Sequence, residues 1–138
     1  MYNRETITHL TKLIGGNDES RQWLLKNNFT ELVLLHYAIG GYDKALKELS
    51  DKKYYEVAAF AHALQGDVKA FHWLAENKKF IWAATLNVIN KKKDAELWLR
   101  RYKLDYYVEL AITIRNEIES ADKGDIFAWF GRLIRKKH

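Results

Sequence analysis

The chain has 138 residues, of which 48% are hydrophobic and 14% aromatic, and this predicts one folded domain with a real core and excludes a disordered tail. It has no cysteine, which excludes disulfides, thiolate metal sites and cysteine nucleophiles, and no proline, so helices can run without fixed breaks. The net charge of +5 comes entirely from residues 65–138, and an excess of this kind could attract an acidic partner.

The N-terminal segment, residues 1–14, is polar and lacks the apolar run of a signal peptide. No stretch of the chain approaches the roughly 18 apolar residues of a membrane span. We therefore expect a cytoplasmic protein that makes no contact with membranes. Residues 5–14 have the apolar spacing of a helix, and we expect this helix to cap the elements that follow.

An internal repeat of 25 residues begins at the diglycine Gly15–Gly16 and returns at Gly40–Gly41. Extended without gaps, this spacing aligns four segments: 15–39, 40–64, 65–89 and 90–114. One alignment column is always leucine and another always bulky and apolar. The members are Leu24, Leu49, Leu74 and Leu99 in the first column, and Leu32, Val57, Trp82 and Tyr107 in the second. Several matching columns in one register favour a true repeat over chance.

Each repeat has the apolar spacing of two short helices, predicted over 43–50 and 54–64 in the second unit. Links this short force antiparallel neighbours, so each unit should be a helical hairpin. The spacing breaks after residue 114, which predicts that a helix starting near Asp105 continues to about Ala121 before a final helix over 125–136. Residues 115–138 would thus extend and cap the array, giving about ten helices in one domain, 1–138.

This pattern resembles the α-solenoid class that includes tetratricopeptide and ankyrin arrays. The resemblance covers nearly the whole chain, and it implies a right-handed α-α superhelix with a concave surface. It extends to architecture alone, because a proline-free period of 25 residues carries neither family's motif. No functional residue is therefore transferred from those families.

Gly-Asp pairs recur between the predicted hairpins, as in Gly41 and Asp43 or Gly66 and Asp67. Such a loop could hold a phosphate at a helix N-terminus. The known phosphate-binding patterns are absent and no strand precedes the loops. We therefore interpret each pair as a joint, in which glycine ends one helix in the left-handed conformation and aspartate caps the next.

Three tryptophans, Trp23, Trp73 and Trp98, share one column of the repeat. The column also holds Glu48, which indicates a position at the edge of the core. The indoles could simply pack on the core, or they could form a half-exposed row that binds a peptide or protein surface.

A basic row is formed by Lys53, Lys78 and Lys103, which recur at the turn inside each hairpin. Arg100 and Arg101 add to it in the fourth unit. Such a row could follow a nucleic-acid backbone, with Tyr102, Tyr106 and Tyr107 able to stack on bases. The alternative is a solvated set of turn residues, since lysine suits helix C-termini.

The five histidines fall in no shared column and show no metal-binding spacing, so we expect no metal, no cofactor and no catalytic residues. The leading hypothesis is a non-catalytic helical-repeat module that binds a protein or peptide on its concave surface. The alternative hypothesis is a nucleic-acid-binding α-solenoid that uses the basic C-terminal half.

Overall fold

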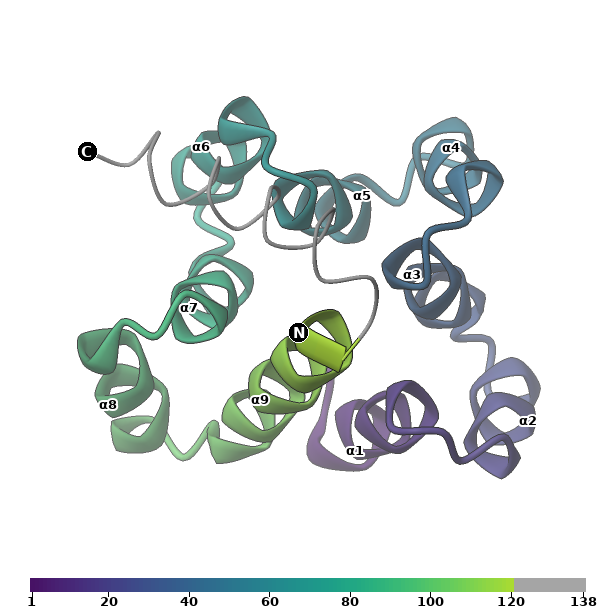
Figure 1. The fold of residues 1–138 in the computed structure, drawn as a ribbon, viewed down its shortest axis with the longest axis horizontal. Coiled ribbons are helices and arrows are strands. Elements are labelled where there is room, and N and C mark those ends of the chain that lie inside the picture. Colours follow the sequence, from purple (N-terminus) through teal and green to yellow (C-terminus); the bar gives the residue numbers. More distant parts are fainter. Residues whose placement is uncertain (121–138) are drawn as a thin grey trace.

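The computed structural model describes residues 1–120, which contain nine α-helices and no strand (Figure 1). The helices are α1 (Arg4–Ile14), α2 (Glu19–Lys26), α3 (Thr30–Ile39), α4 (Asp43–Asp51), α5 (Tyr55–Leu64), α6 (Val68–Glu76), α7 (Phe80–Ile89), α8 (Lys93–Arg101) and α9 (Asp105–Ser120). The prediction of an all-α fold is confirmed. The helices predicted over 43–50 and 54–64 agree with α4 and α5 to within one residue. The final helix predicted over 125–136 lies outside the described residues.

Helix α9 is longer than the others because the 25-residue spacing ends there. It runs for 16 residues, whereas α3, α5 and α7 each have 10. The extra turns bring Ile118 into the buried core. The predicted extension past residue 114 is thus confirmed as far as Ser120.

The two columns identified in the sequence form the centre of the core. All four leucines of the first column are fully buried, and the members of the second column are at most 3% exposed. An amphipathic helix buries residues that recur on one face, so a short helix with one such face needs a neighbour to cover it. The hydrophobic core accordingly runs through all nine described helices, with no break between successive units.

The helices are arranged in a closed ring (Figure 1). Helices α1, α3, α5, α7 and α9 lie on the inside, and α2, α4, α6 and α8 lie outside them. The ring closes because α1 packs against α9, where Arg4 pairs with Asp105 at 3.5 Å and lies over the Tyr106 ring. The contacts show an array whose first and last described helices meet; they do not show a right-handed superhelix.

Closure of the ring changes what the inner helices can do. The facing side chains that would line the concave groove of an open array are instead packed together, as Phe60, Trp82 and Tyr107 illustrate. The Phe60 and Trp82 rings lie 4.6 Å apart, and Trp82 meets Tyr107 edge to face at 5.7 Å. The surfaces left open to a partner are therefore the outer helices and the two faces of the ring where the helices end.

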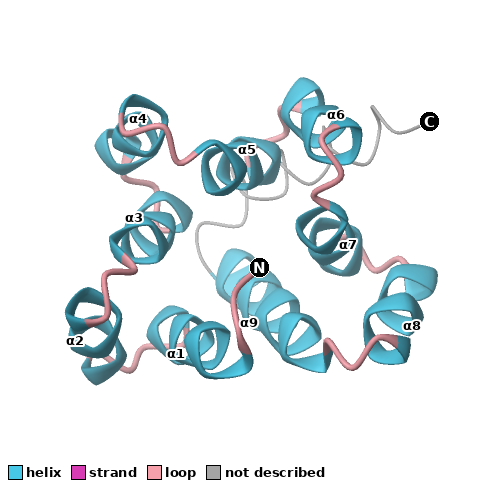
Figure 2. Cartoon of the chain, turned by 180° about the vertical axis from the view of Figure 1, so that it is seen from behind, coloured by secondary structure: helices cyan, strands magenta, loops and turns pink. Residues whose placement is uncertain are grey.

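Links of three residues, or four after α1, turn the chain back between successive helices (Figure 2). The joints therefore alternate between the two faces of the ring. We call the face with the joints inside the hairpins the lysine rim; its joints contain Asn28, Lys53, Lys78 and Lys103. We call the opposite face the glycine rim; its joints contain Gly16, Gly41, Gly66 and Lys91.

Candidate binding surface at the lysine rim

All eight joints use the same backbone geometry. In each, the residue after a positive-φ residue donates its N–H to a carbonyl five residues back, as from Tyr54 to Leu49 at 3.0 Å and from Tyr42 to Tyr37 at 3.1 Å. This is the Schellman motif, which satisfies carbonyls left free at the end of a helix.

The diglycines are joints and not phosphate loops. The N–H of Gly41 donates to the Ala38 carbonyl at 3.1 Å, and the next N–H is bonded as described above, so neither is free for an anion. The second glycine of each pair carries the positive φ, +108° at Gly16 and +98° at Gly41. The predicted aspartate cap is found at Asp67, whose carboxylate accepts from the Ala70 N–H at 3.2 Å.

The aspartates of the other two Gly-Asp joints within the described residues, Asp18 after Gly16 and Asp43 after Gly41, do not cap as predicted. Asp18 precedes α2 but its side chain bonds to none of the first N–H groups, because the neighbouring Asn17 accepts from the Glu19 N–H at 3.0 Å. Asp43 is already the first residue of α4, since Tyr42 takes the capping position there. The recurring glycine is thus a better predictor of the joint than the recurring aspartate.

A cavity of about 670 Å³ opens on the lysine rim between the N-terminal segment and α5, α6 and the joints beside them. We call it the rim cavity. Its apolar wall consists of Met1, Tyr2, Phe29, Tyr54, Tyr55, Val57 and Trp73. Its polar wall consists of Lys53, Glu56, Asn77 and Lys79. A second cavity of about 190 Å³ shares Met1, Glu56 and Lys79 with it and continues to Lys78 and Phe80.

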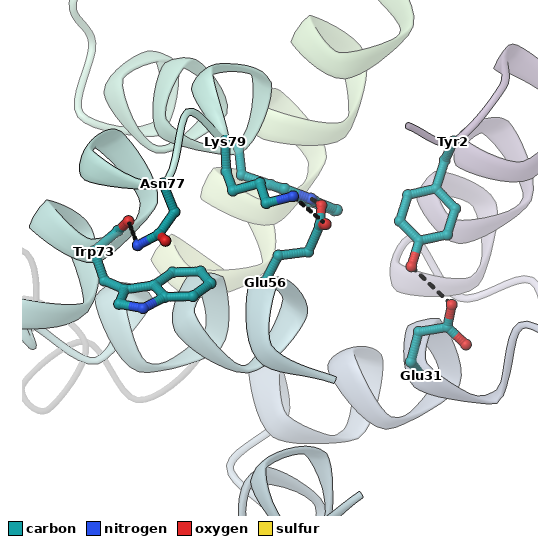
Figure 3. A network of polar contacts seen from close by, with 7 residues as sticks. Tyr2, Glu31, Glu56, Trp73, Asn77 and Lys79 are labelled. Carbon is teal, nitrogen blue, oxygen red and sulfur yellow. Dashed lines mark hydrogen bonds and ion pairs between the residues drawn. The ribbon is translucent and has the colours of Figure 1, made fainter. Parts of the chain in front are cut away.

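Two carboxylates at this face, Glu31 and Glu56, have partners within the protein (Figure 3). Glu31 accepts a 2.7 Å hydrogen bond from the Tyr2 hydroxyl. Glu56 accepts from the Trp82 indole N–H at 2.8 Å, and its other oxygen lies 3.4 Å from the Lys79 ammonium. Two of the negative charges nearest the rim cavity are thus engaged by internal donors.

Tyr2 crosses the mouth of the ring and joins helices that are far apart in sequence. Its ring packs edge to face on Phe29 and Trp82, at 5.9 and 6.1 Å. Burial, followed by the hydrogen bond to Glu31, raises the pKa of the Tyr2 phenol well above its ordinary value. Burial also raises the pKa of the Tyr107 phenol. Both phenols are therefore neutral donors at physiological pH, with no tendency to act as bases.

The three lysines of the basic row have no counter-charge among the described residues. Within residues 1–120, no carboxylate lies within 4.0 Å of the ammonium of Lys53, Lys78 or Lys103, and all three residues are exposed. Lys53 lines the rim cavity and Lys78 lines the second cavity, whereas Lys103 lines neither. Two of the three lysines are thus brought to the same hollow surface.

The arginines added to that row behave differently. Arg100 is engaged by Glu96, with Nε donating to a carboxylate oxygen at 3.0 Å, whereas Arg101 is exposed. Of the tyrosines expected to stack on bases, Tyr107 is 1% exposed and is closed to any ligand. The face of Tyr106 is covered by the Arg4 guanidinium at 4.8 Å. Only Tyr102, which is 59% exposed, presents a ring to solvent.

The tryptophans of the shared column are all half-buried and pack on the core. Trp23 is stacked between His9 and Phe29, with ring centroids 4.1 and 6.2 Å away. Trp98 rests against Tyr102 at 5.1 Å. Only Trp73 lines the rim cavity, where its carbonyl accepts from the Asn77 side chain at 2.8 Å.

Several residues of this surface were not identified from the sequence. Tyr54 and Tyr55 follow Lys53 directly, and an aromatic pair beside an unpaired lysine at a helix start is a signal that could have marked them. Tyr2 lies outside the repeat and gave no such signal. Its role depends on closure of the ring, which brings residue 2 beside α3 and α7.

No cluster of three or more histidine, aspartate or glutamate side chains that could hold a metal ion is found in the part of the chain that the structure describes. No helix among these residues is both long and apolar enough to cross a membrane. Comparisons with known proteins return no matching family model, no matching curated protein and no matching solved structure.

Proposed function

We propose that this chain is a non-catalytic helical-repeat module that binds a protein or peptide at its lysine rim. The rim cavity is the observation that carries the proposal. Its volume of about 670 Å³ lies within the range of pockets that hold ligands, and its wall combines aromatic rings with a few polar groups, as such pockets do. The module would be a solenoid-like array curved until its ends meet. The cytoplasm remains its expected location, because the absence of cysteine suits a reducing compartment.

Exposed apolar side chains border the two cavities and support a protein partner. Met1, Tyr55 and Phe80 are 87%, 58% and 52% exposed, and each lines at least one of the cavities. A contiguous exposed apolar surface beside polar groups is typical of interaction sites, where aromatic anchors contribute most of the binding energy.

The test compares two exposed tyrosines on opposite faces. The full chain is used to select binders from a random dodecapeptide display library, and affinities are measured for wild type, Tyr55→Ala and Tyr42→Ala. Tyr55 lies at the rim cavity, whereas Tyr42, which is 65% exposed, lies at a glycine-rim joint and serves as the control. We expect Tyr55→Ala to weaken binding at least tenfold and Tyr42→Ala to leave it unchanged. Selection of no binder, or equal effects of the two variants, would contradict the proposal.

A second candidate function is nucleic-acid binding, which the unpaired Lys53, Lys78 and Lys103 favour. Phosphate-dominated binding weakens steeply between 50 and 200 mM salt because counterions are released. The measurement is the affinity for a 20-nucleotide oligothymidylate across that range of salt. Binding that is tight at 50 mM, falls steeply with salt and is lost on reversing the three lysines to glutamate would support this candidate over the first.

A further inference from the structure

The lysine rim combines an apolar hollow with cations that lack partners within the part of the chain that the structure describes. The carboxylates that line or border the hollow, Glu31 and Glu56, are held by internal donors. The ammonium groups of Lys53 and Lys78 have no such partner among residues 1–120. Among the residues that line the two cavities, the charge left without a partner in the described chain is therefore positive.

From this arrangement we infer that the ligand of the lysine rim is an acidic peptide segment with an aromatic or large aliphatic anchor. This inference rests on the proposed function. The anchor side chain enters the rim cavity beside Trp73 and Tyr54, and flanking Asp or Glu side chains contact the ammonium groups of Lys53 and Lys78. Charge complementarity decides the partner here, and the apolar wall decides where its anchor sits.

The backbone at these lysines strengthens the argument. Lys53 and Lys78 have φ of 66° and 60°, a left-handed conformation that strains the backbone of an L-residue with a Cβ. Three of the four matching joints on the glycine rim use glycine. The lysine rim thus carries long cationic side chains at joint positions where the glycine rim, apart from Lys91, has no side chain.

The distribution of cations at this surface favours a peptide over a nucleic acid. Of the basic row, Lys53 and Lys78 line the two cavities, whereas Lys103 lines neither and Arg100 is engaged by Glu96. A phosphodiester backbone would therefore meet no continuous row of unpaired cations among the described residues. A peptide can place one apolar side chain in the rim cavity and direct its carboxylates to the two lysines.

The experiment uses the full chain and the same random dodecapeptide display library, with sequencing of the enriched peptides. The best binder is then synthesised with a fluorescent label and titrated by anisotropy at 50 and 200 mM salt. The variants are the double mutant Lys53→Glu/Lys78→Glu and two controls. Lys91→Glu changes a lysine with φ of 64° on the glycine rim, and Lys103→Glu changes a lysine-rim residue away from the cavities.

We expect enriched peptides to carry an aromatic or large aliphatic residue within a few positions of Asp or Glu. Reversing two exposed charges should weaken their binding at least tenfold, because reversal replaces two attractions by two repulsions. Lys91→Glu should change the affinity less than twofold and Lys103→Glu only slightly more. Thermal melts by circular dichroism check that all variants fold.

The outcomes separate this inference from the proposed function. Peptides that bind in a Tyr55-dependent way, but show no acidic bias or no response to the double reversal, overturn the inference and leave a peptide-binding rim. If no peptide is enriched, or if binding ignores both Tyr55→Ala and the reversal, both are overturned. If oligothymidylate binds, is lost on the double reversal, and competes with no acidic peptide, the surface is a nucleic-acid site and both are again overturned.

Discussion

The two rims of the ring form the same joint from different residues. On the glycine rim, three of four positive-φ positions are glycine, whereas on the lysine rim three are lysine and one is asparagine. The hydrogen bonds of the motif are the same on both rims, with the closing N–H···O distances between 2.8 and 3.1 Å. The comparison shows that the joint needs only a residue able to adopt positive φ. The backbone geometry of the joint therefore does not decide which residue fills the position.

The two rims also differ in the space that surrounds their joints. On the glycine rim, an apolar space of negligible free volume lies between helix ends and is lined by residues that include Ala38, Leu64 and Ile118. On the lysine rim the helix ends surround an open cavity with a hydrogen-bonded network at its edge. The lysine rim therefore has an open hollow with two positive-φ lysines, Lys53 and Lys78, beside it.

The largest effect should come from removing the aromatic support beneath the lysine rim. Trp82 is 3% exposed and contacts Phe60, Tyr2 and Tyr107. We expect Trp82→Ala to lower the free energy of unfolding by about 3–5 kcal/mol, because it creates a large cavity and leaves Glu56 without its indole donor. Urea denaturation measures this. Trp82→Phe, which keeps most of the bulk, should cost clearly less; an equal loss would contradict the packing argument.

The need for a positive-φ residue at the glycine-rim joint can be tested by substituting two adjacent glycines. Gly41 has φ of +98°, so Gly41→Ala should destabilise the fold by about 1–2 kcal/mol through backbone strain, although nothing lies within 4 Å of the added methyl. Gly40 has φ of −74° and only ordinary contacts at 3.4 Å or more. Gly40→Ala should therefore be neutral or stabilising by up to about 1 kcal/mol. The ordering of the two melting temperatures is the readout, and a reversed ordering would refute the joint assignment.

The buried Tyr2 phenol, which donates to Glu31, predicts that the free energy of unfolding depends on pH in the alkaline range. Because the pKa of Tyr2 is raised in the folded state, the unfolded chain gives up its phenol proton first, so the free energy of unfolding should fall as pH rises above about 10. Tyr2→Phe should cost about 1–2 kcal/mol at neutral pH through loss of the bond to Glu31, and it should make the alkaline decline shallower. Tyr107 supplies the slope that remains. Denaturation curves at pH 8 to 11 measure both effects. An unchanged slope in the variant would exclude the Tyr2 phenol as the source of the alkaline decline.

The smallest expected effect is an increase in the free energy of unfolding. Lys53→Gly and Lys78→Gly should each raise the free energy of unfolding by about 0.5–1 kcal/mol, because glycine relieves the strain at positive φ but has a more flexible unfolded chain. Lys52→Gly is the matched control, since Lys52 has φ of −88° and pairs with Glu48 at 2.9 Å, and it should destabilise. If the lysine-to-glycine changes also abolish peptide binding while raising the melting temperature, the difference between the two rims reflects function rather than folding.

Much of the fold could be predicted because the 25-residue spacing depends on residues close together in the sequence. The recurring leucine of each unit and the glycine that closes it predicted where helices begin and end, and the structure agrees within a residue in the second unit. The extension of α9 was also predictable, since a break in the spacing is visible in the sequence. For the tryptophans, the sequence predicted only that they occupy the same position in successive units. What each indole contacts depends on neighbouring helices, which that position does not identify.

By itself, the sequence determined the helical class, the spacing of the joints and the residues that face the core, because these depend on apolar periodicity and on which residues tolerate positive φ. Only the tertiary structure decided that the array closes upon itself. Closure results from the small rotation between successive hairpins, summed over the chain, and no single unit encodes that sum. It is closure that brings Tyr2 to Glu31, buries Tyr107, and leaves Lys53 and Lys78 around a hollow on one face.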